Sequence, residues 1–300
     1  AHALFPQISV EIWGISHSLA ALALVIAGRY ALLERLMKLF IALMLALVLI
    51  TAVWVAPDLA VFGNGLLIPL IPEGSVLFII GVIGGVGGSV TLLCYGYWIR
   101  EKGWTQANHL TRVRKDLSVA YILTGLFGIA IMIIAAGVKP EVITGTQIVI
   151  GLAEKLETVV GPFGKWCFLI GFWSAVFSSM LGVWQGVPYL FADFVQQYTR
   201  QPAGPVTVDT RSPAYRYYLL YLALPPMVLL LIGKPVWLVI IYAVAGALFM
   251  PLLALLLLYM NSRGSWLGDY KNGFITNIIL SISIVVFAML MYSEIVKLTG

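Results

Sequence analysis

Long runs of apolar residues, separated by short polar stretches, dominate the pattern of this chain. A helix that crosses the hydrocarbon core of a bilayer needs about 20 mostly apolar residues. Eight runs meet this requirement, at residues 8–27, 33–55, 76–99, 117–138, 166–191, 217–233, 236–260 and 274–292. The pattern therefore predicts an all-α, polytopic transmembrane helical bundle that forms one transmembrane domain over residues 1–300.

Two segments depart from a simple spanning helix. The run at 217–233 is short and contains Pro225 and Pro226, so we expect a kink or a tilt there. The segment 146–160 is too short to cross a bilayer, and its charged residues gather near one end. It is predicted to be a surface helix on the outer side.

Composition supports the same class of protein. Apolar residues make up 61% of the chain and charged residues 10%, which excludes a soluble enzyme or a soluble binding module. The net charge of +5 comes from short basic clusters between apolar runs, not from one patch, so no nucleic-acid partner is predicted. Cys94 and Cys167 both lie inside apolar runs, and we interpret them as packed thiols rather than as a disulfide or a metal site.

The basic residues also predict the topology, because cytoplasmic loops retain an excess of Lys and Arg. Thirteen of the 18 basic residues lie in one set of alternate loops and five in the other. The first set is predicted to be cytoplasmic, which places the C-terminus outside. We expect a multi-pass protein of the plasma (inner) membrane, embedded in the lipid bilayer.

A glycine-rich stretch in the third run is the strongest candidate for function. Five glycines occur between Gly81 and Gly88, and each raises the cost of a continuous helix by about 1 kcal/mol relative to alanine. One reading is a discontinuous helix at mid-membrane, whose unpaired carbonyls can coordinate an ion. The other is that small residues allow two helices to approach closely. The pattern leaves both open.

Other polar residues in apolar runs are weaker candidates for a functional role. His17 is interpreted as a hydrogen-bonded packing residue rather than part of a proton relay. Ser174, Ser178 and Ser179 are expected to mediate close helix contact. Tyr95 and Gln185 are weak candidates for groups that face a wet cavity.

Several motifs resemble the Nramp-type divalent metal transporters. The stretch from Gly28 to Leu39 (GRYALLERLMKL) is similar to the segment that leads into that family's fifth helix. Residues 174–186 are similar to its eighth helix, and Met250-Pro251 with residues 267–272 to stretches near its end. The resemblance covers the family's fourth to eleventh helices and implies a partial inverted-repeat, LeuT-like transporter fold. We expect the first three helices, with an Asp-Pro-Gly motif that carries the main anionic ligand, to precede Ala1.

The chain departs from this family at its ion-binding positions. Where the family's sixth helix reads Ala-Thr-Val-Met-Pro-His, residues 88–93 read Gly-Ser-Val-Thr-Leu-Leu, so that Thr91 replaces the methionine and Leu93 the histidine. Trp98 falls near a second family histidine and Ala243 near a family glutamine. Loss of the soft thioether resembles the Nramp-related magnesium transporters, and the resemblance implies Gly88 and Thr91 as metal-contacting residues, with water completing the shell.

Three functions follow from these patterns. The first is transport of partly hydrated Mg²⁺ and/or Mn²⁺ by alternating access, with the ion as substrate, no cofactor and no obligate protein partner. The second is transport of an organic solute such as an amino acid on the same general fold. The third, a membrane-embedded enzyme, has little support, because the chain has three histidines and neither an HExxH nor a GxSxG motif.

Overall fold

The computed structural model describes residues 1–27, 30–55, 74–87, 89–138, 147–200, 208–230 and 235–299. These residues form helices joined by turns, with no strand among them. The helices are α1 (Val10–Ala27), α2 (Tyr30–Val55), α4 (Val76–Gly87), α5 (Ser89–Glu101), η1 (Ala107–His109), α6 (Leu110–Val138), α7 (Gln147–Arg200), α8 (Pro213–Ala223), α9 (Pro225–Leu229), α10 (Pro235–Asn261), α11 (Gly264–Leu267), η3 (Gly268–Tyr270) and α12 (Phe274–Thr299).

The all-α, polytopic fold class is confirmed. Within the described ranges, six helical stretches are long and apolar enough to cross a membrane, or seven if the pair 264–270 and 274–290, bent by 120°, counts as one span. The six lie in α1, in α2, across α4 and α5, across η1 and α6, in α7 and in α10. The eight-span arrangement stays a prediction.

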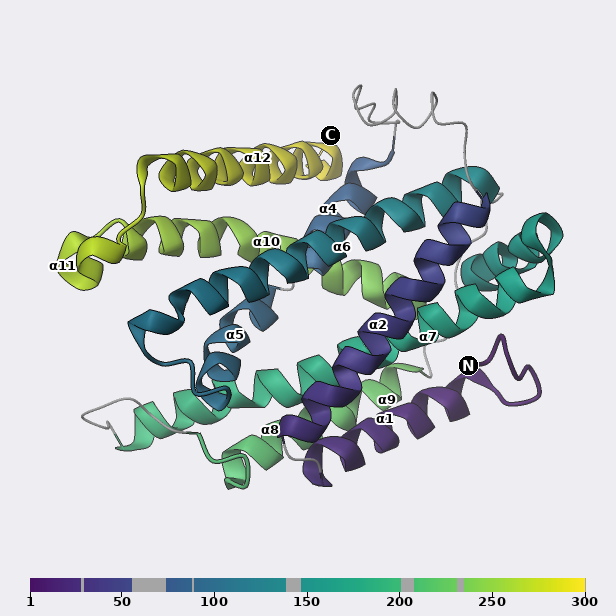
Figure 1. Cartoon of the computed structure of the whole chain (residues 1–300), viewed down its shortest axis with the longest axis horizontal. Helices are drawn as coiled ribbons and strands as arrows, with labels where there is room; N and C mark the ends of the chain where they lie inside the picture. Colours follow the sequence, from purple (N-terminus) through teal and green to yellow (C-terminus); the bar gives the residue numbers. More distant parts are fainter. Residues whose placement is uncertain are drawn as a thin grey trace. The chain divides into compact units, whose positions relative to one another are not determined.

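The chain divides into two compact units, of which unit 1 comprises residues 1–67 and 94–235. Its centre is α2, which packs along α7 and also contacts α6 (Figure 1). Helices α1 and α8 pack against α7 and against each other. Leu181 of α7, fully buried, lies in the core cluster that these helices share with α2.

Helix α7 bends at Gly161, whose backbone adopts φ 80° and ψ 178°. A positive φ of this size favours glycine, because a side chain would meet the backbone. Before the bend, Ala153 and Leu156 are 1% and 0% exposed and pack against residues of α2 and α6. The segment predicted as a surface helix at 146–160 is helical from Gln147, with one face in the core and Glu154, Thr158 and Val159 exposed, while its position on the outer side stays a prediction.

The two prolines at 225 and 226 separate α8 from α9. Helix α8 begins at Pro213 after Ser212, whose hydroxyl accepts a hydrogen bond from the Tyr215 backbone N–H at 3.4 Å. It ends at Ala223, because the prolines lack the N–H groups that would continue the hydrogen-bond ladder. The predicted interruption of the run at 217–233 is found at this point.

Unit 2 comprises residues 68–93 and 236–300. Helix α4 remains regular through Gly81, Gly84 and Gly85 as far as Gly87. A Cβ atom at Gly84 would overlap the carbonyl oxygen of Ala243 and lie 2.6 Å from the backbone nitrogen of Ala247 on α10. At Gly84 the close-packing interpretation of the glycine run therefore holds. Gly88 lies outside the described residues, and the discontinuity expected there stays a prediction.

We predict that Gly84→Val lowers the stability of unit 2 by about 1–3 kcal/mol, because overpacking forces α4 away from α10. Thermal unfolding in detergent micelles measures this loss. Gly81→Ala is the matched control on the same helix, since a Cβ there meets no atom within 4 Å. An alanine at Gly81 should leave stability unchanged or raise it by roughly 1 kcal/mol. Equal stability of the valine variant and the control would contradict the close contact.

Candidate functional site

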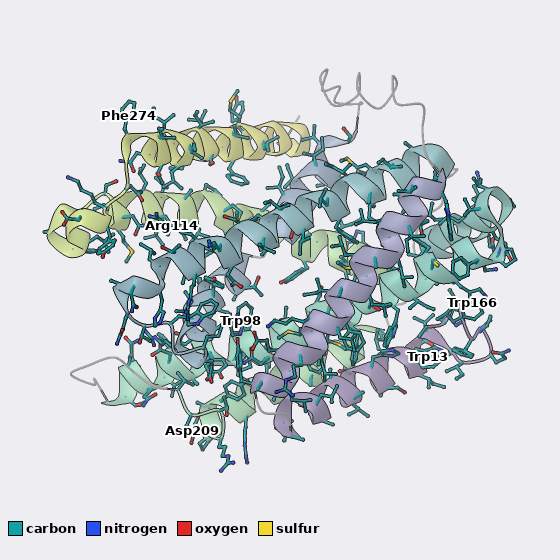
Figure 2. The ribbon with its side chains drawn as sticks, in the orientation of Figure 1. Trp13, Trp98, Arg114, Trp166, Asp209 and Phe274 are labelled. Carbon is teal, nitrogen blue, oxygen red and sulfur yellow. The ribbon has the colours of Figure 1, made fainter. Side chains whose placement is uncertain are left out.

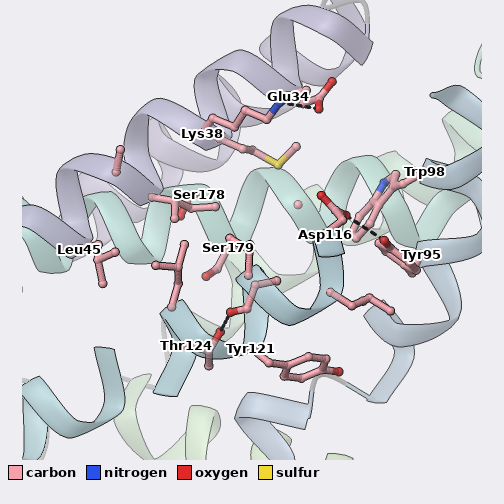
Figure 3. A pocket seen from close by; sticks show the side chains of 18 of the residues that line it. Glu34, Lys38, Leu45, Tyr95, Trp98, Asp116, Tyr121, Thr124, Ser178 and Ser179 are labelled. Carbon is pink, nitrogen blue, oxygen red and sulfur yellow. Dashed lines mark hydrogen bonds and ion pairs between the residues drawn. The ribbon is translucent and has the colours of Figure 1, made fainter. Parts of the chain in front are cut away.

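A cavity of about 840 Å³ lies within unit 1, between α2, α5, α6 and α7 (Figure 3). Its walls are largely apolar, with Leu45 of α2 and Phe127 of α6 among them. Polar groups come from the start of α2, the end of α5 and the start of α6. They include Tyr30, Glu34, Lys38, Tyr95, Lys102 and Asp116.

Two carboxylates and two ammonium groups share the polar part of the cavity. The Lys102 Nζ atom lies 3.3 Å from Glu34 Oε1 and 3.8 Å from Asp116 Oδ1, so it bridges α2 to α6. Glu34 also pairs with Lys38 at 2.8 Å, one helical turn away on α2. The Lys102 and Glu34 side chains are only 20% and 23% exposed, so solvent screens their attraction less than it would at an open surface. The two positive charges of Lys38 and Lys102 thus equal the two negative charges of Glu34 and Asp116.

Hydroxyl groups extend this polar region. Tyr95 donates a hydrogen bond of 2.8 Å to Asp116 Oδ2, and Figure 3 shows the phenol directed at that carboxylate. Ser179 and Thr124, which also line the cavity, donate to backbone carbonyls four residues earlier in their own helices. Each hydroxyl proton is thus engaged, while the oxygen lone pairs remain able to accept from water or to face a cation.

Helices α5 and α7 are joined by two reciprocal hydrogen bonds. Tyr97 of α5 donates to Asp193 of α7, and Tyr189 of α7 donates to Glu101 of α5 at 2.7 Å. In each helix the tyrosine and the carboxylate are four residues apart and therefore share a face. The two tyrosine rings stack with centroids 5.5 Å apart. We call these four residues the α5–α7 clasp.

Beside the clasp, one turn before Tyr189 on α7, the same helices approach closely. Trp98, labelled in Figure 2, donates its indole N–H to Gln185 Oε1 at 2.5 Å. The Gln185 backbone carbonyl accepts a hydrogen bond of 2.9 Å from Tyr215 of α8. A Cβ at Gly186 would lie 2.9 Å from the Trp98 ring and 3.2 Å from Cys94 Cβ, so α5 rests on α7 where that helix has no side chain.

Of the two metal-contacting residues that the resemblance implies, Gly88 lies outside the described residues and Thr91 is described. Thr91 is the third residue of α5 and is half-buried. It is not among the described residues that line the cavity. No contact between it and a metal is tested, so both positions stay predictions. Gln185, expected as a weak cavity-facing candidate, is instead a buried partner of Trp98.

His17 uses both ring nitrogens in packing contacts. Nδ1 lies 2.7 Å from the Trp13 carbonyl, and Nε2 accepts a hydrogen bond of 2.8 Å from the Trp173 indole. Because a carbonyl can only accept and an indole N–H can only donate, the ring is neutral, with its proton on Nδ1. Trp13, whose position Figure 2 marks, and Phe177 surround the ring. These contacts support the packing role inferred from the sequence.

Sequence reasoning missed the bridge made by Lys102 and also the clasp. Hydropathy places Glu34, Asp116 and Asp193 near the ends of apolar runs but does not show which donors they meet. One signal was available: a tyrosine four residues before a carboxylate occurs in both α5 and α7. That spacing indicates a shared helix face, and two such faces can exchange hydrogen bonds.

We predict that Lys102→Gln lowers the stability of unit 1 by about 1 kcal/mol, because the carboxylates of Glu34 and Asp116 lose their shared cation. Adding Asp116→Asn should recover part of the loss, since one uncompensated charge is then removed. Lys115→Gln, an exposed residue on α6, is the control and should have little effect. Thermal unfolding in detergent gives all three values, and equal effects of Lys102→Gln and Lys115→Gln would contradict the bridge.

Comparison with known protein families shows the family to which this chain belongs. A family model described as natural resistance-associated macrophage protein-like, or Nramp, matches residues 1–297. No curated protein matches the chain. Members of the Nramp family are transporters of divalent metal ions, not enzymes, and the apolar helices described above agree with an integral multi-pass membrane protein. The chain therefore belongs to the Nramp family of divalent metal-ion transporters.

Proposed function

We propose that this transporter moves a partly hydrated divalent cation, Mg²⁺ in preference to Mn²⁺, by alternating access. The observation that carries the proposal is the charge-balanced, oxygen-rich end of the cavity next to α5. As the resemblance implies, the ion meets Thr91 and main-chain oxygens near Gly88. In this proposal the cation is the transported substrate and not a cofactor.

The size of the cavity supports passage of an ion that keeps water. Six waters occupy about 180 Å³ at about 30 Å³ each, and the cavity measures about 840 Å³. Mg²⁺ gives up its water reluctantly and is commonly bound with several waters in place. A hydrated ion can therefore exchange hydrogen bonds with carboxylates and hydroxyls without losing its shell.

The charge balance of the cavity supports release rather than storage. Lys38 and Lys102 already neutralise Glu34 and Asp116, so an arriving cation meets no excess of negative charge. Conduction needs binding that is strong enough for entry and weak enough for exit. The paired carboxylates meet this requirement better than two unpaired ones would.

The donor atoms favour a hard cation. Thr91 offers an oxygen where the resemblance expects a thioether, and oxygen ligands suit Mg²⁺ while sulfur suits softer metals. The thioethers of Met37 and Met44 also line the cavity. Met37 packs against the apolar core, which gives its side chain a structural role. Because the lining holds both oxygen and sulfur atoms, an uptake assay in which Mg²⁺ and Mn²⁺ compete decides which ion is preferred.

The polar end of the cavity is proposed to face the cytoplasm. It lies at the start of α2 and at the α5–α6 connection, which carry Arg35, Arg112, Arg114 and Lys115 in addition to the cavity lysines. Loops rich in Lys and Arg remain on the cytoplasmic side. The ion then leaves the cavity into the cytoplasm, and the C-terminus is external in the plasma membrane.

We predict that Thr91→Trp reduces Mg²⁺ uptake into proteoliposomes at least tenfold, because an indole fills the ion's path, while expression and thermal unfolding stay near wild type. Thr91→Ser keeps the hydroxyl and should retain uptake. Thr91→Met supplies a thioether and should shift competition toward Mn²⁺. Uptake of an amino acid in place of either ion by the unaltered protein would overturn the proposal.

A further inference from the structure

Helices α5 and α7 meet through a short series of specific side-chain contacts. Four interactions follow one another along α5: Cys94 against Gly186, Tyr97 with Asp193, Trp98 with Gln185, and Glu101 with Tyr189. Helix α8 supports the contact from the other side, since Tyr215 meets the Tyr189 ring edge-on with centroids 5.3 Å apart. Tyr189 is only 3% exposed.

Opening this contact would break both reciprocal bonds together. Each tyrosine would lose its carboxylate and each carboxylate its phenol donor, and the buried Tyr189 hydroxyl would be left without its acceptor. Because both bonds join the same two helices, neither can be lost by a separating motion while the other remains. The clasp therefore resists separation of α5 from α7.

The surroundings of α5 change at Cys94. The boundary between the two compact units falls after Leu93, inside this helix. Val90 and Leu93 are 38% and 42% exposed, whereas Cys94 is fully buried. Thr91 precedes Cys94 by three residues, which is about 4.5 Å along a helix axis. Thr91 thus lies less than one turn from the point at which α5 becomes fixed to α7.

We propose that Tyr97, Glu101, Tyr189 and Asp193 are positioning residues for transport: they hold α5 from Cys94 onward against α7 throughout the cycle, and the movement that changes access to Thr91 occurs before Cys94. This inference rests on the proposed function, because it concerns the placement of Thr91 toward the ion. A clasp that opened in every cycle would be a gate, and the two roles predict opposite responses to a cross-link.

The native Cys94 on α5 lies where a second cysteine on α7 could form a disulfide with it. A Cβ at Gly186 would lie 3.2 Å from Cys94 Cβ and 3.3 Å from its sulfur. Disulfides have Cβ atoms about 3.5–4.5 Å apart, so Gly186→Cys can bond to Cys94 after a shift of a few tenths of an ångström. The disulfide would fasten α5 to α7 one turn before the clasp.

The test compares uptake of Mg²⁺ or Mn²⁺ by Gly186→Cys in proteoliposomes before and after oxidation by copper-phenanthroline. We expect the oxidised protein to transport within twofold of the reduced one. A loss of tenfold or more that dithiothreitol reverses would overturn the positioning role and make the contact a gate. Cys94→Ala/Gly186→Cys cannot form the bond, so its uptake must not respond to the oxidant. No ion uptake by the unaltered protein would instead sink the proposed function.

A second set of variants covers the case in which the Trp98 ring prevents Gly186→Cys from folding. Tyr189→Phe removes one reciprocal bond, whereas Glu101→Gln keeps a carbonyl that accepts from Tyr189. We expect Tyr189→Phe to raise the KM for the ion about fivefold with little change in maximal rate, and Glu101→Gln to stay within twofold of wild type. Tyr97→Phe/Tyr189→Phe should be no worse than the more severe single variant. A faster maximal rate with unchanged KM, or lower thermal stability with both constants unchanged, would overturn the inference.

Discussion

A carboxylate near a membrane span has to find its donors within the protein, because lipid tails offer none and an unpaired charge there is costly. Four carboxylates at one end of unit 1 obey this constraint. Glu34 and Asp116 share Lys102, and Asp116 also accepts from Tyr95. The other two, on α5 and α7, each accept from a tyrosine of the opposite helix. Helix α5 is consequently tied to α2, α6 and α7 by polar bonds.

Close approach of backbones complements these polar bonds. Helices in a bilayer gain little from the hydrophobic effect when they associate, because the lipid is as apolar as their side chains. Contact between small residues replaces it. Gly186 lets α5 lie on α7 within unit 1, and Gly84 lets α4 lie on α10 within unit 2. At both positions a single methyl group would meet atoms of the neighbouring helix.

Much of the helical framework could be predicted from hydropathy. Apolar runs longer than about 20 residues have few alternatives to a helix when lipid is the solvent, because each backbone group must be paired within its own segment. The break at Pro225 was also predictable, since it follows from the missing N–H groups of proline. The burial of Leu156 was not, because a short segment with three charges gives no indication that its apolar face meets α2 and α6.

The candidate site was predictable only in part, for a physical reason. Residue type shows that Thr91 can offer an oxygen, but not what lies opposite it. Lys102 was counted as a topological charge, and its pairing with Glu34 depends on how α2 and the end of α5 meet in space. Such pairs join residues far apart in the sequence, so periodicity within one helix does not contain them. The spacing of Tyr97 and Glu101 is the exception, because both partners' faces can be read from four-residue repeats.

The two polar systems of unit 1 have different consequences for a moving cation. The pairs of Glu34, Lys102 and Asp116 face a cavity, and the Glu34 and Lys102 side chains are long and flexible, so under the proposed function these pairs can rearrange around a hydrated ion. The clasp is made by aromatic rings stacked against each other, one of them almost fully buried, so it has little freedom to adapt. If both systems were flexible, α5 would have no fixed contact with α7. If both were rigid, the ion could not pass. A rigid contact with α7 beside an adaptable cavity satisfies both demands.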